Sequence, residues 1–346
     1  MGPNPPANNY RVTLSLSKAT THADGELALP GASVGINDGY ICFVSASDAI
    51  TDVYTISSAV TGGKNIQNSD LGSTSVILDN VPGASIKVYM VANTGTIANL
   101  PAPVVGGSMT AYMTRNMDVR DQGLYTSVTT VGNADLEESG TPDLKTADIE
   151  LYTDVAHIQI KNIKFEGDVS GKVAGIFING YYPTMKLNGE GNSLTSSNIA
   201  NDYDEENGSD IFPVALKTFV YDDIEGKVFE ANATTPASVS PVTNDGVWGY
   251  NLFKSATPQI IIKLTDVVAL GQNLLEDQFV TINGFRNSLT SAPITTLAGG
   301  MIYTINTDYL VIKYENMSII PGVRPMQVDV TVVPVTWQET NVSPNI

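Results

Sequence analysis

The sequence has few basic residues and few charged residues of any kind. Its 346 residues include 18 Lys and Arg against 36 Asp and Glu, a formal net charge of −18. A protein that binds nucleic acid needs a basic face to displace phosphate counterions, so this balance argues against that class. It also argues against docking on an anionic membrane surface. The charged fraction is only 16%, against a usual value of about 25%, which is typical of secreted β-proteins.

Cysteine and histidine are almost absent. The one cysteine, Cys42, excludes an intramolecular disulfide framework and any multi-cysteine metal site. It lies in the apolar run 40–44, where we interpret it as a small buried residue of a strand. Of the two histidines, His157 lies in a predicted strand, and we interpret it as a structural or surface residue rather than a general base.

Long apolar runs are also missing. No run of about 18 apolar residues exists, so no membrane-spanning helix is predicted. No signal peptide is visible, which indicates either a cytosolic protein or a chain that begins after a removed leader. Residues 1–9 are rich in Pro and Asn, which predicts an extended tether and favours the second alternative.

Apolar residues recur with a period of two, which predicts β-strands throughout the chain. The first predicted strand has apolar residues at alternate positions: Tyr10, Val12, Leu14 and Leu16. Strands follow every 10 to 20 residues or so, separated by Gly, Pro, Asn and Asp, and this pattern predicts an all-β protein built from sandwiches. Residues 106–113 are predicted to be extended. Residues 264–278 stay open between helix and strand, because Gly271 weakens the helical pattern.

The length predicts about two domains at roughly 150 residues each. Residues 133–143 are acidic and rich in turn residues, so they are the candidate boundary. We predict a tether over 1–9, an N-terminal β-sandwich domain over 10–146 and a C-terminal β-sandwich domain over 147–346. The apolar phase changes within residues 148–165, which predicts either a bulge or two strands.

No motif supports catalysis. Residues 31–35 match the G-x-S-x-G pattern of serine hydrolases, but Pro30 precedes them and turn residues follow, so the required strand–turn–helix context is missing. Residues 62–65 and 171–173 lack the spacing of a phosphate-binding loop. We therefore predict a protein that is not an enzyme and that binds no cofactor.

The densest acidic patch, residues 202–210, is the one weak candidate for a metal site. Carboxylates at alternate positions can hold Ca²⁺, and here they are Asp202, Asp204 and Glu206. The Gly and Glu that an EF-hand loop needs at its sixth and twelfth positions are absent. We interpret the patch as a solvated acidic loop, with an irregular cation site as the alternative.

The C-terminal region carries a long apolar strand marked by a proline. Its apolar positions fall in two phases: Val328, Val330 and Val332, then Val333, Val335 and Trp337. Pro334 removes a ladder N–H, which confines it to a sheet edge or a bulge. Such a strand either completes its own sheet or completes the sheet of a neighbour, and the spacing alone leaves both open.

Four segments occur in an order found in one known family: residues 2–16, 81–93, 147–158 and 300–337. The third is similar to an L-x-R-x-V-A-R strand, with Thr153 in place of the usual Arg. The fourth is similar to R-N-x-Y-x-I and terminal V-x-V-x-V-x-P-W strands, with Gly in place of Arg-Asn and two residues between Pro334 and Trp337. Across nearly the whole chain, the sequence resembles the fimbrillins, the major and minor subunits of Bacteroidia-type (type V) fimbriae.

The resemblance implies two tandem transthyretin-like β-sandwich domains. It implies a structural subunit (shaft, accessory or tip) of a surface fimbria that supports adhesion and biofilm formation. It further implies a lipoprotein precursor that is exported through the periplasm and the outer membrane and touches the membrane only through its lipid. The implied partners are strand-donating and strand-accepting subunits, together with ligands on host or bacterial surfaces.

The family also implies a mode of assembly. A protease removes the first strand, here Tyr10 to Leu16, and the terminal strand of another subunit fills the groove. The donor residues would then be Val328, Val330, Val332, Val333, Val335 and Trp337. The candidate cleavage sites are Lys18, after the strand, and Arg11, inside it. If neither is cut, the subunit keeps its strand, as an accessory or tip subunit would.

A glycan-binding surface lipoprotein is the alternative function. Aromatic side chains on a sheet face would form the binding platform, and the candidates are Trp248 with Tyr250 and Tyr181 with Tyr182. The competing interpretation of these residues is that they belong to the core.

Overall fold

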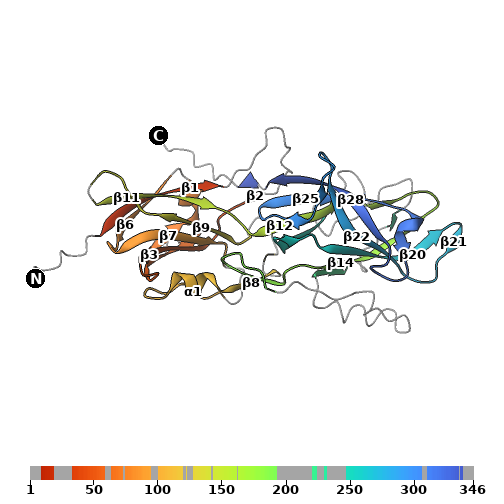
Figure 1. Cartoon of the computed structure of the whole chain (residues 1–346), viewed down its shortest axis with the longest axis horizontal. Helices are drawn as coiled ribbons and strands as arrows, with labels where there is room; N and C mark the ends of the chain where they lie inside the picture. The colour runs from red at the N-terminus through yellow and green to blue at the C-terminus, as the bar shows by residue number, and fades with distance from the viewer. Residues whose placement is uncertain are drawn as a thin grey trace, which may run out of the picture. The chain divides into compact units, whose positions relative to one another are not determined.

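The computed structural model describes residues 9–18, 33–58, 64–72, 75–94, 100–119, 122, 128–141, 143–161, 163–192, 220–223, 230–231, 247–305, 310–334 and 336–337. Nearly all of its regular elements are strands, which confirms the predicted all-β class (Figure 1). Contacts divide the chain into two compact units. Unit 1 comprises residues 1–155, 184–190 and 334–346, and unit 2 comprises 156–183 and 191–333. Within the described ranges, no helix has the length and apolar character needed to cross a bilayer.

Unit 1 contains two main sheets, with strand orders β10-β11-β1-β6 and β5-β4-β3-β7-β9. Its elements are β1 (Tyr10–Lys18), β2 (Ser33–Val34), β3 (Gly39–Ser45), β4 (Ile50–Ser57), β5 (Asn65–Gln67), η1 (Asn68–Gly72), β6 (Val76–Val81), β7 (Ser85–Ala92), α1 (Met109–Met113), β8 (Asn116–Asp118), β9 (Thr130–Asp135), β10 (Glu137–Glu138), β11 (Leu144–Leu151), β15 (Thr184–Lys186) and β29 (Thr336–Trp337). The inner faces of both sheets contribute to one apolar core.

The alternation of apolar and polar residues along strands of unit 1 gives these strands one apolar face each, and these faces form the core. Along β4 buried and half-buried residues alternate, so one face of the strand meets the opposite sheet. Phe43 of β3 and Tyr54 of β4 pack edge to face with ring centroids 5.9 Å apart. Cys42 is fully buried in β3, as its apolar run predicts.

The prediction of extended chain over residues 106–113 is wrong, because the helix α1 forms there. Ser108 caps it by accepting a hydrogen bond at Oγ from the Ala111 N–H at 3.0 Å. Asp48 also accepts from the Thr110 N–H. Met109 and Tyr112, three residues apart, are buried on one face of the helix.

The hydroxyl of Tyr112 is buried and has no hydrogen-bond partner among the described residues, and burial raises its pKa. We expect Tyr112→Phe to leave the free energy of unfolding unchanged or raise it by up to about 1 kcal/mol, because it removes an unpaired polar group. Urea unfolding measures this. The matched control is Tyr54→Phe, which removes a hydroxyl that donates to the Asp79 carbonyl at 2.8 Å and is expected to cost about 1 kcal/mol. A loss at Tyr112 as large as that at Tyr54 would contradict the prediction.

Unit 2 is built on a 12-stranded sheet whose main path is β16-β14-β20-β22-β28-β25-β12-β18. Its elements are β12 (Val155–Lys161), β13 (Ile163–Phe165), β14 (Ser170–Asn179), β16 (Val220–Asp223), β17 (Glu230–Ala231), β18 (Val247–Phe253), β19 (Ser255–Ala256), β20 (Gln259–Ala269), β21 (Gln272–Asn273), β22 (Gln278–Asn287), β23 (Pro293–Ile294), β24 (Thr296–Leu297), β25 (Met301–Ile305), β26 (Leu310–Ile312), η6 (Tyr314–Asn316), β27 (Met317–Ser318) and β28 (Pro325–Pro334).

Two ambiguous stretches are resolved as strands. Residues 264–278 continue β20, turn at Leu270 and Gly271, both with positive φ, and pair back as β21. The phase change within residues 148–165 marks separate strands, β11 in unit 1 and β12 with β13 beyond it. The sequence places the domain boundary between residues 146 and 147, inside β11. The division by contacts instead falls between Val155 and Ala156.

His157 of β12 is a structural residue of unit 2. Its Nδ1 lies 2.8 Å from Oδ1 of Asn251 in β18, and burial lowers the pKa of the imidazole. An unfolded histidine has a pKa near 6.5, so below about pH 6.5 the unfolded chain binds more protons than the folded one. We therefore expect the stability of unit 2 to be full above about pH 6.5 and to decline as the pH falls toward 5. Urea titrations between pH 5 and 7.5 test this, because His157→Gln should flatten the decline. An unchanged pH profile in that variant would refute the assignment.

Candidate strand-acceptor site

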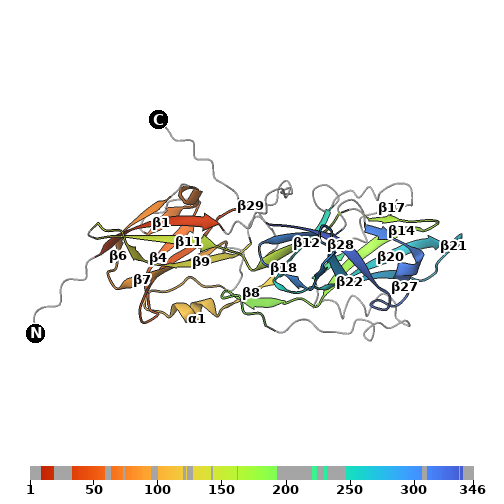
Figure 2. The ribbon, with the colours of Figure 1, turned by 45° about the horizontal axis from the view of Figure 1, so that its top comes forward.

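Strand β1 is internal to its sheet. It runs parallel to β11, from Arg11 opposite Leu144 to Lys18 opposite Leu151. On its other side it runs antiparallel to β6, where Leu14 lies opposite Val76. Figure 2 shows β1 next to β11. Taking β1 away would leave two strands with unpaired backbone groups facing a gap one strand wide.

The core-facing side of β1 is made of the four alternate residues that the sequence singles out. Val12 is 0% exposed and Leu14 is 1% exposed. Tyr10 and Leu16 are partly buried and pack against the same core. The floor of this position, which we call the β1 slot, is the unit 1 core itself. It is formed by Ile41, Phe43, Tyr54, Ile56, Leu78, Val88, Met90, Ala147 and Ile149, among others.

A buried lysine closes the Tyr10 end of the β1 slot. Lys145 of β11 is 8% exposed, and its Nζ lies 4.2 Å from the centroid of the Tyr10 ring. Its ion-pair partner is Glu138 of β10, with Nζ and Oε1 3.5 Å apart. Sequence analysis missed Lys145, because the parallel pairing that brings it under Tyr10 leaves no local pattern in the sequence.

The two candidate cleavage residues differ in their setting. Arg11 lies within the ladder, donates its N–H to the Asp143 carbonyl at 2.8 Å and pairs with Asp79 at 2.6 Å. The side chains of Arg11 and Asp79 are more than half exposed, so this pair contributes at most about 1 kcal/mol. Lys18 is the last residue of β1, and its side chain lies outside the described part.

Among the described strands, β6 is the last of its sheet on this side. A groove of about 370 Å³ lies there between β6 and the β4–β5 side of the opposite sheet, and its lining includes Tyr54, Ile66 and Leu78. The Tyr54 hydroxyl spans the two sheets to the carbonyl of Asp79. In the part of the chain that the structure describes, β6 is therefore the one strand that bounds this side of the β1 slot.

The predicted donor strand lies inside the sheet of unit 2. Strand β28 is hydrogen-bonded between β22 and β25, and its pairing with β22 ends at Val330 opposite Asn287. Val328, Val330 and Val333 are 3%, 1% and 5% exposed, whereas Val332 is half-buried, so the buried phase changes before Val333. In this chain the strand completes its own sheet, the first of the two alternatives.

Beyond β28 the chain passes to unit 1. Strand β29 runs parallel to β2, with Ser33 opposite Thr336 and Val34 opposite Trp337. Val335 and the side chain of Trp337 lie outside the described part.

The glycan-platform and metal candidates are residues other than those named for the β1 slot. Tyr181 is 2% exposed, which confirms the interpretation of Tyr181 as a core residue and rules it out as part of an exposed platform. The half-buried Tyr182 has its ring against the backbone of Gly191. The side chains of Trp248 and Tyr250 lie outside the described part, as do Asp202, Asp204 and Glu206. Among the residues described, no cluster of three or more His, Cys, Asp or Glu is placed to hold a metal.

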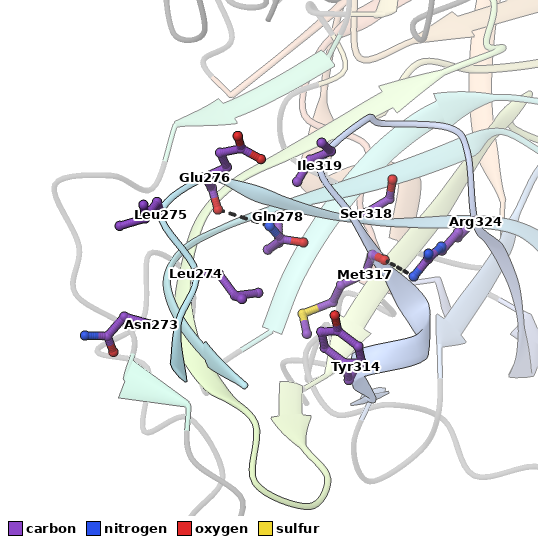
Figure 3. Close-up of a pocket in the computed structure, with 10 residues that line it drawn as sticks. All are labelled: Asn273, Leu274, Leu275, Glu276, Gln278, Tyr314, Met317, Ser318, Ile319 and Arg324. Atoms are coloured by element: carbon purple, nitrogen blue, oxygen red, sulfur yellow. Dashed lines mark hydrogen bonds between the residues drawn. The ribbon is translucent and has the colours of Figure 1, made fainter. Parts of the chain in front are cut away.

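Unit 2 has a cavity of about 430 Å³ beside the β20–β21 hairpin (Figure 3). Leu275 at its rim is fully exposed, and Tyr314 is 43% exposed. Gln278 donates to the backbone carbonyl of Glu276 at 3.1 Å, and Arg324 donates to that of Met317 at 3.0 Å. Among the described residues, the lining holds one carboxylate and no histidine or cysteine, so these residues offer neither paired carboxylates nor a nucleophile with a histidine base.

No protein-family model and no curated protein matches the sequence. Solved structures match it over nearly its whole length. A "putative cell adhesion protein" from Bacteroides eggerthii DSM 20697 is 15% identical with a TM-score of 0.56, covering 97% of this chain and 98% of that one. A protein of the same description from Parabacteroides distasonis ATCC 8503 is 13% identical with a TM-score of 0.58, covering 97% and 99%.

A fimbrial assembly protein from Parabacteroides distasonis ATCC 8503 also matches, at 13% identity and a TM-score of 0.45, covering 89% of this chain and 93% of that one. Identities this low establish a shared fold, and the first two matches establish it across both units. The chain therefore shares the fold of putative cell adhesion proteins from Bacteroides eggerthii and Parabacteroides distasonis.

Proposed function

We propose that the protein is a structural subunit of a cell-surface fimbria and that it assembles by strand complementation. The observation that carries the proposal is the internal position of β1 over the unit 1 core. The shared fold supports it. On this proposal the two units correspond to the tandem transthyretin-like domains of the fimbrillins, and the fimbria supports adhesion and biofilm formation. The chain reaches the surface as a lipoprotein precursor.

The β1 slot provides the driving force. Loss of β1 exposes the backbone edges of β11 and β6 and uncovers the core contacts of Val12 and Leu14. An apolar strand from a neighbour restores the ladder and buries alternate side chains together, which makes insertion favourable.

The proposed donor is the C-terminal strand of a neighbouring subunit, Val328 to Trp337. In the isolated chain β28 completes its own sheet, but its pairing with β22 ends at Val330. Residues 331–337 therefore extend beyond the β22 ladder, and their uptake by a neighbour leaves that ladder intact. Uptake gives up the contacts of β28 past Val330, which include the contact between the Ser288 and Thr331 hydroxyls and the burial of Val333.

The role of the subunit depends on its processing. Cleavage after Lys18 would release the whole of β1, whereas cleavage after Arg11 would leave most of it paired with β11. We propose Lys18 as the cleavage site of a shaft subunit. A chain that keeps β1 would serve as an accessory or tip subunit.

The test is the N-terminal sequence of the protein in purified surface fimbriae. A start at Ala19 supports processing and an open β1 slot. Intact β1 in every fimbrial copy would exclude a shaft role. Absence of the protein from fimbriae would contradict the proposed function as a whole.

A further inference from the structure

Lys145 sets a requirement on any strand that replaces β1. Lys145 is 8% exposed, its Nζ lies 4.2 Å from the centroid of the Tyr10 ring, and the Glu138 carboxylate is 3.5 Å away. Departure of β1 removes the ring and opens the ammonium to water. A strand that refills the slot buries the ammonium again, which is unfavourable if Glu138 is then its only partner. A replacing strand stabilises Lys145 best if it brings an aromatic ring to the place of Tyr10.

Building on the proposed function, we propose that the C-terminal segment of a second copy enters the β1 slot in the direction opposite to β1, with Trp337 over Lys145. Trp337 is the only aromatic residue after Tyr314. The alternate residues before Trp337 lie on the same face of an extended strand as its indole, and they are Val335, Val333 and Thr331. In the reversed direction, Trp337 takes the position of Tyr10 and Val335 that of Val12. Val333 then takes the position of Leu14 and Thr331 that of Leu16.

The polarity of each position fits this register. The two fully buried positions, Val12 and Leu14, receive valines. Thr331 falls at Leu16, which is only partly buried. Pro334 falls at Thr13, which lies on the other face of β1 and pairs with Ile77 of the single bordering strand β6.

Insertion in the same direction as β1 fits less well. The register that places Val328, Val330 and Val332 inward puts Met326 over Lys145. The register that places Val333, Val335 and Trp337 inward puts Thr331 there and carries the indole to the Leu16 end. Both leave the Lys145 ammonium without an aromatic partner. The reversed strand would run antiparallel to β11 and parallel to β6, and both ladders are common in sheets.

Disulfide trapping distinguishes the registers. The full chain receives a protease recognition sequence between Lys18 and Ser33, and after cutting, a synthetic peptide of residues 328–340 is added in excess to displace β1. Asp148→Cys on β11 lies beside the Ser15 position of the β1 slot. The reversed register brings Val332 to that position, and the two same-direction registers bring Thr331 or Thr336. Native Cys42 does not interfere, because it is buried and its thiol pKa is raised to about 12.

We expect the Val332→Cys peptide to form the disulfide and the Thr331→Cys and Thr336→Cys peptides to fail. A disulfide through the Thr331→Cys or Thr336→Cys peptide overturns the register and leaves the proposed function standing. Displacement of β1 without any of the three disulfides has the same consequence. A peptide that never displaces β1 overturns both.

The contact with Lys145 has its own readout. The Trp337→Ala peptide should bind about 3- to 30-fold more weakly than the native peptide, whereas Trp337→Phe should recover most of the affinity. In a receiving chain with Lys145→Met, the difference in affinity between the native peptide and the Trp337→Ala peptide should be smaller. If the two peptides differed in affinity by the same factor for the native and the Lys145→Met receiving chains, Lys145 would not account for the preference for the indole.

Discussion

Deletion of residues 1–18 is expected to unfold unit 1 while unit 2 stays folded. The deletion removes an internal strand with two fully buried side chains, Val12 and Leu14, each worth about 1.5–3 kcal/mol. It also leaves the ladders on β11 and β6 without partners, at a further cost for each buried group. The total is expected to exceed 5 kcal/mol, which is comparable with the whole stability of a small domain. Urea unfolding followed by circular dichroism should then lack the transition of unit 1.

Rescue in trans makes this prediction specific. A peptide of residues 9–18 should restore the missing transition, because it refills the β1 slot with native side chains. The same peptide with Leu14→Asp should fail, whereas Leu16→Ala should lose little, since Leu16 is only partly buried. A deletion variant that retains the unit 1 transition without peptide would show that the core does not depend on β1.

A smaller version of the experiment avoids truncation. Leu14→Ala in the full chain should lower the free energy of unfolding of unit 1 by about 2–5 kcal/mol, because Leu14 is 1% exposed. Leu16→Ala serves as its partly exposed neighbour and should cost less. Equal losses at the two positions would contradict the burial on which the β1 slot rests.

The features that sequence predicts well here are the local ones. The inward face of β1 follows from a period of two within seven residues, and the buried Cys42 follows from its apolar run. The phase change near Val332 is also visible in sequence and corresponds to a real change of buried face in β28. Each of these depends only on which residues alternate along one strand.

The features that sequence misses depend on distant pairing. Lys145 looks like an ordinary surface lysine until parallel pairing of β1 with β11 brings it beneath Tyr10. The first turn of the helix α1 is capped by Ser108 and also by Asp48, about sixty residues earlier. The residues next to the helix therefore contain only part of the capping pattern that would predict it. The position of β28 between β22 and β25 is a property of sheet order, which periodicity cannot predict.

That sheet order leads to the second large effect, which concerns the C-terminus. Deletion of residues 325–346 removes an internal strand of unit 2, including the buried Val328 and Val330, and should unfold that unit. Deletion of residues 334–346 instead keeps every β22–β28 pair, the last of which is at Val330. We expect the shorter truncation to fold with two transitions in urea but to be lost from fimbriae, because it lacks Val335 and Trp337.

A third truncation supplies the control. Deletion of residues 338–346 keeps the whole proposed donor and should enter fimbriae at the level of the full chain, as measured by immunoblotting of purified fimbriae. Normal incorporation of the chain lacking residues 334–346 would place strand donation elsewhere. If that chain instead lost the unit 2 transition, it would show that Pro334 and the residues after it stabilise the sheet of their own chain. Assembly and folding are thus separated after Val330, where the β22 ladder ends and the residues of the proposed donor register begin.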